Sequence, residues 1–162
     1  MGKKEDKTNV MRVLDKNKVP YISRKYEPNS RLTGSQIANT LGENPSEVFK
    51  TLVTVCKKSK EHYVFMIPVN KELDLKKCAK AVNEKNIEMI LQKDLLGLTG
   101  YVHGGCSPIG MKKQFVTTID ETANSFESIK FSAGKVGYQV EVKFEDLKKV
   151  INLNIADLTK DN

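Results

Sequence analysis

Apolar residues recur at intervals of three and four positions in several segments, which is the spacing of an amphipathic helix. Residues 74–82 show it most regularly, and Asp74 can cap the first turn with its side chain. Thr8 and Thr33 offer the same kind of cap to two earlier segments. The pattern predicts helices over 10–17, 33–41, 74–82 and 144–151, with shorter helical segments over 93–98 and 120–124.

Other segments are rich in β-branched and aromatic residues or alternate between apolar and polar positions, as strands do. Polar residues 57–61 separate two such runs and predict a hairpin, and Gly134 and Gly137 bound a second tight turn. The predicted strands are 21–26, 48–56, 62–69, 86–91, 115–119, 129–134 and 138–142.

Strands and helices interleave along the chain, with hairpins among them. We therefore expect one domain over 8–158 with a mixed sheet, of the α/β or mixed α+β class. Residues 1–7 carry mixed charges and no apolar pattern, so we expect a disordered lead-in there.

Composition is that of a soluble globular protein, since 39% of the 162 residues are hydrophobic and 29% are charged. No apolar run approaches the roughly 18 residues of a membrane helix, and the first residues lack a signal-peptide core. We therefore expect a cytoplasmic protein with no membrane contact. A formal charge of +7 favours an anionic partner, and we expect RNA rather than DNA.

The three cysteines, Cys56, Cys78 and Cys106, are scattered and form no C-x-x-C pair. The spacing predicts neither a disulfide framework nor a zinc ribbon, and reduced thiols fit a cytoplasmic protein. The two histidines, His62 and His103, also lie far apart, so we predict no metal site.

Residues 99–110 hold four glycines, together with Ser107 and Pro108. Glycines allow positive φ and a close approach of backbone N–H groups to a ligand. The segment is therefore a candidate cradle for an anion or an ester carbonyl. A tight turn between two strands is the alternative, and the local sequence leaves both open.

Lys50 is unusual because it stands at the start of an otherwise apolar strand, where an unpaired ammonium is costly to bury. It is either solvated at the strand end or held beside a cavity as a phosphate or carbonyl ligand. Tyr26 ends the first predicted strand and is a second candidate to face a pocket.

Several sequence blocks, taken in order, resemble the YbaK family of free-standing aminoacyl-tRNA deacylases. These enzymes are related to the editing domain of bacterial prolyl-tRNA synthetases. The resemblance covers nearly the whole chain, and its blocks are Val48–Leu52, Pro68–Val69, Leu73–Lys77, Thr99–Tyr101, Gly104–Gly110, Ile119–Asp120 and Ser132–Gly137.

The resemblance implies a single compact domain with a mixed, partly barrel-like β-sheet surrounded by helices. It implies hydrolysis of the ester that joins a wrong amino acid to tRNA, by positioning and substrate assistance, without a metal or other cofactor. Cys-tRNA(Pro) is the implied substrate, with Ala-tRNA(Pro) as the alternative within the family. Prolyl-tRNA synthetase is the implied protein partner.

The family motifs place specific roles on residues of this chain. Lys50, Gly104 and Gly105 fall at catalytic positions. The implied substrate-binding residues are Tyr26, Thr51, Ser107, Ser132, Gly134 and Gln139.

Three residues depart from the family pattern. Cys106 replaces an aliphatic residue, Val136 an arginine, and Gln139 a residue that is often acidic. The last two changes together suggest a swapped ion pair or a weaker hold on the substrate. Cys106, three residues from His103, is also a candidate nucleophile. A non-catalytic module that binds tRNA or a synthetase is the competing hypothesis.

Overall fold

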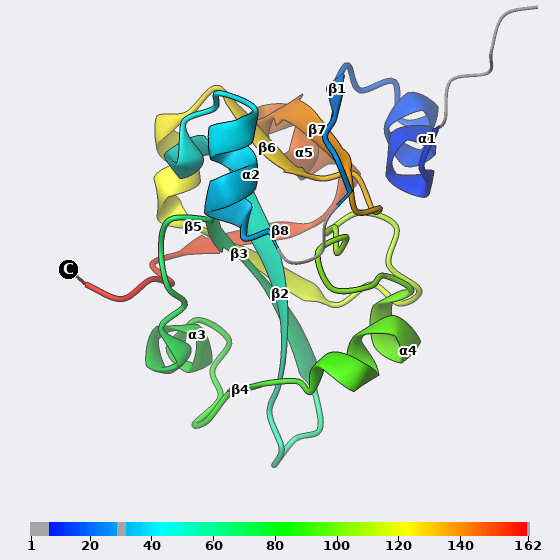
Figure 1. The fold of residues 1–162 in the computed structure, drawn as a ribbon. Helices are drawn as coiled ribbons and strands as arrows, with labels where there is room; N and C mark the ends of the chain where they lie inside the picture. Colours follow the sequence, from blue (N-terminus) through cyan, green and yellow to red (C-terminus); the bar gives the residue numbers. More distant parts are fainter. Residues whose placement is uncertain (1–6, 29–31, 162) are drawn as a thin grey trace, which may run out of the picture.

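The strands form two sheets, labelled in Figure 1 of this computed structural model, which describes residues 7–28 and 32–161. One sheet is antiparallel, in the order β1–β7–β6. The other is mixed, in the order β4–β2–β3–β5–β8, with β5 parallel to both of its neighbours. The strands are β1 (Ile22–Lys25), β2 (Phe49–Val55), β3 (His62–Pro68), β4 (Glu88–Met89), β5 (Val116–Asp120), β6 (Ser128–Ser132), β7 (Tyr138–Lys143) and β8 (Leu153–Ala156).

The predicted mixed α/β domain is confirmed. The described strands form two sheets and no closed barrel, so the barrel-like detail is not supported. An isolated parallel bridge between Val48 and Lys130 links the two sheets, and the Lys130 ammonium lies 3.1 Å from the Glu47 carboxylate. β7 lies between β1 and β6, and within the described residues the outer edge of β6 pairs with the larger sheet through this bridge alone.

The helices begin where the sequence places their caps. The Thr8 hydroxyl accepts a hydrogen bond from the Met11 N–H, and Thr33 forms a capping box with Gln36. The Asp74 carboxylate accepts hydrogen bonds from the Lys76 and Lys77 N–H groups. The helices are α1 (Asn9–Lys16), α2 (Gly34–Thr40), α3 (Leu75–Ala81), α4 (Leu95–Thr99) and α5 (Phe144–Val150), with 3₁₀ turns at Pro45–Glu47, Gln92–Asp94 and Glu121–Ser125.

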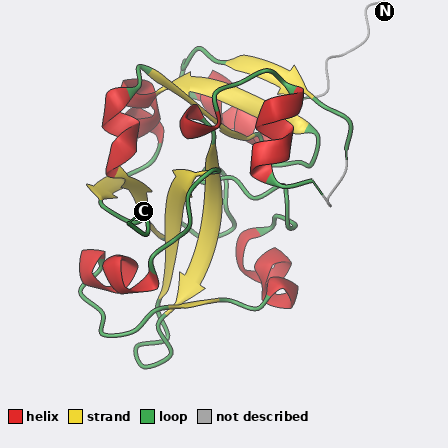
Figure 2. Ribbon diagram, turned by 60° about the vertical axis from the view of Figure 1, so that its left-hand side comes forward, coloured by secondary structure: helices red, strands yellow, loops and turns green. Residues whose placement is uncertain are grey.

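The core lies on both faces of β3, whose hairpin with β2 stands at the centre of Figure 2. Val64 and Met66 face the larger apolar cluster, which α1, α5 and the three-stranded sheet complete. Phe65 and Ile67 face a smaller cluster that includes Cys78 of α3. Burial of both faces explains the nearly continuous apolar run of β3.

Two predictions about strands need correction. The strand predicted over 86–91 shortens to β4, because only Glu88 and Met89 pair with β2 before the backbone turns into 3₁₀ geometry. The sequence pattern predicts no strand at the position of β8, which pairs in parallel with β5 at the edge of the sheet. Its side chains are half-buried or exposed, so it lacks the apolar run of an inner strand.

The predicted lead-in over 1–7 lies outside the described residues except for Lys7. The Lys7 ammonium lies 2.6 Å from the carboxylate of Asp15, in the last turn of α1.

We expect Asp120→Ala to lower the free energy of unfolding by about 2 kcal/mol. The side chain is buried, and its carboxylate accepts hydrogen bonds from the Leu158 N–H at 2.9 Å and the Thr122 hydroxyl at 2.7 Å. Removal of the carboxylate leaves both donors without this partner. Urea unfolding measures the loss, with Asp94→Ala as a control at an exposed position. Equal small effects of the two changes would contradict the expectation.

Candidate functional site

A cavity of about 520 Å³ lies where the two sheets meet α2 and the glycine-rich segment. Both sheets contribute to its wall, since Val48–Val53 come from β2 and the residue before it, and Phe131 and Tyr138 from β6 and β7. Of the predicted site residues, six line this cavity: Tyr26, Lys50, Thr51, Gly104, Ser132 and Gln139. The cavity lining does not include Gly105, Ser107 or Gly134.

Lys50 places an ammonium group on the cavity wall. It pairs with Ile67 across the β2–β3 ladder and is half-buried. Burial lowers the pKa of this ammonium, and the negative charge of Glu72 opposes the shift. Within the described residues Lys50 forms no ion pair or hydrogen bond, so its charge is available to a ligand.

Thr51 and Ser132 add hydroxyl groups to the wall. The buried Thr51 hydroxyl has no hydrogen-bond partner among the described residues. The Ser132 hydroxyl accepts a hydrogen bond from the Gly134 N–H at 3.1 Å, which fixes the turn after β6. The Tyr26 N–H donates to the Gly137 carbonyl at 2.9 Å, so the same turn also fixes the position of Tyr26.

The glycine-rich segment is a rigid turn that presents one glycine to the cavity. Gly104 has φ +86° and lines the cavity, whereas the Gly105 N–H already donates to the Val102 carbonyl at 2.9 Å. A methyl group on Gly105 would lie 3.1 Å from the Val136 nitrogen, so Gly105 is needed for close packing. The fully buried Ser107 hydroxyl accepts from the Ile109 N–H within the turn.

Gly134 supports the site from behind the wall. It has φ +93°, and a methyl group there would lie 2.9 Å from the Tyr101 ring and 3.0 Å from Val10. The Tyr101 hydroxyl in turn donates a hydrogen bond to the Ile109 carbonyl. Gly134 therefore allows the β6–β7 turn to pack on the glycine-rich segment.

A polar network that the sequence did not reveal lies behind Gln139. The Gln139 amide donates to the Glu43 carboxylate at 2.9 Å, and the Arg24 guanidinium lies 3.6 Å from Glu43 and 2.7 Å from Glu141. Arg24 alternates with its neighbours like any strand residue, and Glu43 simply follows a helix end. The sequence around Arg24 and Glu43 therefore carries no local signal for these contacts, because their partners Glu141 and Gln139 lie far along the chain.

Cys106 also lines the cavity, but it is nine-tenths buried. Burial raises the pKa of its thiol to about 12, so the thiolate that a nucleophile requires is scarce at neutral pH. His103 is exposed. The geometry favours Cys106 as part of the wall.

We expect Cys106→Ala to leave the rate of any ester hydrolysis in this cavity within about threefold of wild type, because the thiol is protonated. Single-turnover kinetics on an aminoacyl ester measures the rate. A loss of 100-fold or more would restore Cys106 as a nucleophile.

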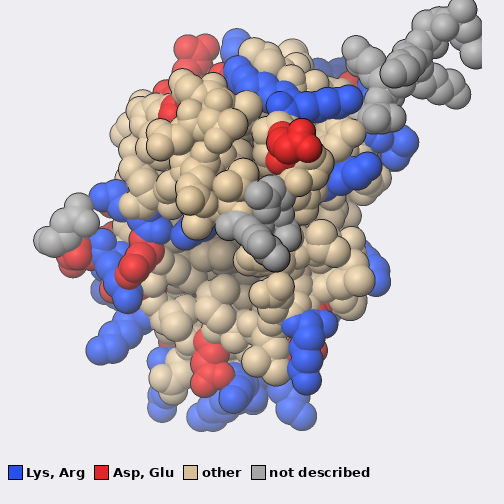
Figure 3. Space-filling view, viewed as in Figure 1, with Lys and Arg blue, Asp and Glu red and all other residues tan. Residues whose placement is uncertain are grey.

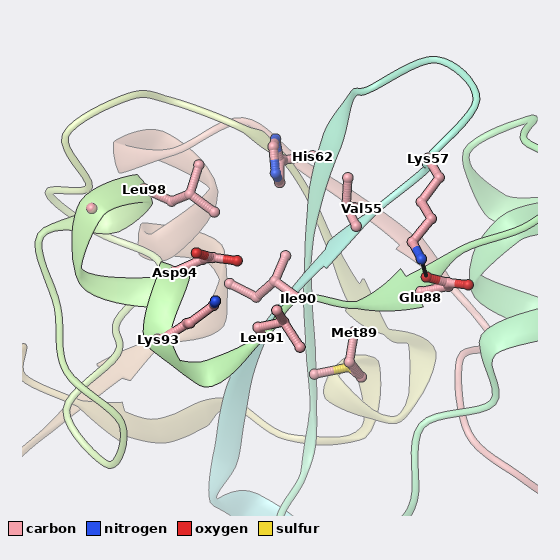
Figure 4. Close-up of a pocket in the computed structure, with 11 residues that line it drawn as sticks. Val55, Lys57, His62, Glu88, Met89, Ile90, Leu91, Lys93, Asp94 and Leu98 are labelled. Atoms are coloured by element: carbon pink, nitrogen blue, oxygen red, sulfur yellow. Dashed lines mark ion pairs between the residues drawn. The ribbon is translucent and has the colours of Figure 1, made fainter.

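A second cavity, of about 620 Å³, lies beside the first and shares Met89 and Ile90 with it (Figure 4). Its wall is largely apolar, and at its rim the Lys57 ammonium pairs with Glu88 at 3.2 Å. None of the predicted site residues lines it. The smaller cavity is therefore the candidate site.

The described residues contain neither a cluster of metal-binding side chains nor a helix that could cross a membrane. No three His, Cys, Asp or Glu side chains in this part of the chain gather as metal ligands would. No helix within 7–28 and 32–161 is long and apolar enough to cross a membrane.

Comparison with known proteins gives matches along most of the chain. Residues 28–150 match the family model of the aminoacyl-tRNA editing domain. A protein of Enterococcus faecalis, named "Putative Cys-tRNA(Pro)/Cys-tRNA(Cys) deacylase EbsC", is 46% identical over 160 residues, which cover 97% of this chain and 96% of that protein.

Solved structures share the fold at lower sequence identity. The crystal structure of hypothetical protein APE2540 matches with a TM-score of 0.84 at 21% identity, over 93% of this chain and 99% of that one. The crystal structure of "a putative trans-editing enzyme for prolyl tRNA synthetase" matches with a TM-score of 0.80 at 20% identity, over 96% of this chain and all of that one.

Proposed function

This chain belongs to the aminoacyl-tRNA editing domain family, and we propose that it is a trans-editing deacylase that hydrolyses the ester between a wrong amino acid and its tRNA. The observation that carries the proposal is the Lys50 ammonium, half-buried on a cavity wall and unpaired within the described residues. The name of the Enterococcus faecalis relative makes Cys-tRNA(Pro) the first substrate to test. Ala-tRNA(Pro) is the alternative that the family resemblance implies.

The reaction needs charge stabilisation more than a protein nucleophile, because an aminoacyl ester is already activated. In the proposed mechanism water attacks the carbonyl carbon, the ribose oxygen leaves and takes a proton, and free amino acid and tRNA result. The substrate assists, through its ribose hydroxyl or, for cysteine, its thiol. Lys50 and the Gly104 N–H stabilise the negative charge on the carbonyl oxygen.

Tyr26, Thr51 and Ser132 are proposed to bind the terminal adenosine and the amino acid, because they line the same cavity. Gly105, Ser107 and Gly134, which do not line it, are proposed to act by holding the wall in place. Prolyl-tRNA synthetase is the proposed partner, and the cytoplasm the proposed compartment, since charged tRNA is used there.

The test is a panel of charged tRNAs: Cys-tRNA(Pro), Ala-tRNA(Pro), Cys-tRNA(Cys) and the correctly charged Pro-tRNA(Pro). We expect hydrolysis of Cys-tRNA(Pro), and no hydrolysis of Pro-tRNA(Pro) beyond the spontaneous rate. Addition of prolyl-tRNA synthetase measures whether the partner raises the rate. Binding without hydrolysis of any member would favour the non-catalytic module instead.

We also expect the affinity for tRNA to fall steeply with added salt, because each phosphate contact releases counterions. The chain carries a formal charge of +7. In Figure 3 lysine and arginine side chains gather at the lower end of the molecule, where Lys57, Lys58 and Lys60 lie exposed at the tip of the β2–β3 hairpin. Filter binding at salt concentrations between about 50 and 200 mM measures how steeply the affinity falls with salt. A flat response would contradict contact with the tRNA backbone.

A further inference from the structure

The second cavity has a wall that combines apolar side chains with an imidazole ring. Its volume of about 620 Å³ lies within the range of pockets that hold small ligands. Val55 and Leu98 line it, together with His62, whose ring is tilted against Phe115 with 5.8 Å between the ring centres. In Figure 4 the side chains of His62, Leu98 and Ile90 face one common space. Nucleobases stack on surfaces of this kind, histidine rings among them.

The charged residues that line the second cavity are two lysines and two carboxylates. Lys57 and Glu88 form an ion pair at 3.2 Å at the rim, so each neutralises the other. Lys93 and Asp94 are exposed, and within the described residues neither side chain forms an ion pair or a hydrogen bond. Asp94 precedes α4, but its carboxylate does not cap that helix and is directed into the cavity in Figure 4. The wall therefore offers one ammonium and one carboxylate to a ligand.

The second cavity is continuous with the candidate cavity, because Met89 and Ile90 line both. Met89 and Leu91 are 44% and 61% exposed on this side of the molecule, so an elongated ligand can pass from one cavity to the other over apolar surface. The proposed substrate is the 3′ end of an RNA strand. Its terminal adenosine occupies the candidate cavity, and the preceding nucleotide must then lie beside that cavity.

We infer that the second cavity binds the cytidine that precedes the terminal adenosine of the tRNA, since tRNA ends in the sequence CCA. The cytosine base lies against the apolar wall and His62, and the phosphate between the two nucleosides contacts Lys93. The exocyclic amino group of cytosine donates a hydrogen bond to Asp94, a pairing that carboxylates make with this base. Uracil carries an acceptor at the same position and cannot make it. The inference rests on the proposed function, which places the terminal adenosine in the candidate cavity.

The test compares three stable amide analogues by NMR titration of the isotope-labelled protein. The first is 3′-deoxy-3′-(L-alanylamino)adenosine, and the other two carry a cytidine or a uridine joined to its 5′ oxygen through a phosphodiester. We expect the wild-type protein to bind the cytidylyl compound about 30-fold more tightly than the adenosine compound. It should prefer the cytidylyl to the uridylyl compound about tenfold. Amide signals of residues 88–98 should move with the cytidylyl compound and not with adenosine alone.

Matched variants assign the preference to single groups. Asp94→Ala should lower the preference for cytidine over uridine to less than twofold, whereas Glu88→Gln should keep it, because Glu88 is already paired with Lys57. Lys93→Met should weaken binding of both dinucleotides about threefold through loss of the phosphate contact. Lys76→Met is its control, since Lys76 lines neither cavity. Circular dichroism melting curves confirm that each variant is folded.

The outcomes distinguish this inference from the proposed function. Equal binding of the adenosine and cytidylyl compounds, no binding of either, or a full cytidine preference in Asp94→Ala overturns the inference. It is also overturned if Leu91→Ser weakens the binding of prolyl-tRNA synthetase while no cytidine preference exists, because the surface then serves a protein partner. If wild type prefers cytidine and Asp94→Ala does not, the inference stands even where no charged tRNA is hydrolysed. In that case the proposed deacylase activity alone fails.

Discussion

Lys50→Met should lower kcat/KM for deacylation by 100-fold or more, with most of the loss in kcat. The Lys50 ammonium lies on the cavity wall and has no ion pair within the described residues. In the proposed mechanism it stabilises charge that develops only in the transition state. Loss of one such preorganised donor costs roughly 100- to 1,000-fold in well-studied hydrolases. Methionine keeps the length and much of the volume of the side chain, so the cavity wall stays filled.

The same change should leave the protein at least as stable as wild type. Burial lowers the pKa of Lys50 in the folded state, so folding disfavours the charged form of this residue. The cost is fully present below the lowered pKa of the folded state, where both states are protonated, and it falls to zero as pH rises through the unfolded pKa of lysine. At neutral pH, Lys50→Met removes the cost.

Single-turnover deacylation and urea unfolding, carried out on the same preparations, separate the two effects. Lys76→Met is the control, because Lys76 is an exposed lysine on α3 and does not line the cavity. It should change neither quantity beyond about twofold in rate or 0.5 kcal/mol in stability. A Lys50→Met enzyme with nearly full kcat would show that the ammonium group plays no part in the chemistry.

Local chemistry explains why much of the fold could be predicted. The caps at Thr8, Thr33 and Asp74 act on backbone groups two or three residues away, so the sequence alone specifies them. The β2–β3 hairpin likewise joins neighbouring segments through a short polar loop. The strand β8 had no such signal, because its partner β5 is distant in sequence and its own residues are partly exposed.

The same distinction between local and distant interactions separates the site residues that could be predicted from those that could not. Lys50 was recognisable because an ammonium in an apolar strand is unusual at its own position. Glu43 was not, because its significance depends on Gln139, 96 residues away. The glycines were recognisable as a group, yet their separate roles depend on packing: Gly104 lines the cavity, while Gly105 packs against the β6–β7 turn.

The contact between the β6–β7 turn and the glycine-rich segment underlies a second prediction. We expect Gly134→Ala to lower the free energy of unfolding by about 3 kcal/mol. Two terms add. A residue with a Cβ at φ +93° is strained by about 1 kcal/mol or more. The new methyl group would also lie 2.9 Å from the Tyr101 ring and 3.0 Å from Val10, and overpacking of a core costs about 1–3 kcal/mol. The ring cannot yield easily, because its hydroxyl is bound to the Ile109 carbonyl.

Gly42→Ala isolates the first of these terms. Gly42 has φ +68°, but a methyl group there would meet nothing within 4 Å, so we expect a loss of only about 1 kcal/mol. Urea unfolding of both variants gives the difference, which is the contribution of close packing between the turn and Tyr101. Similar losses in the two would mean that the contact tolerates a methyl group and that backbone strain alone requires glycine at 134. A larger loss at Gly134 would mean that the turn and the glycine-rich segment pack as one unit, so that the wall residues Ser132 and Gly104 keep their positions together.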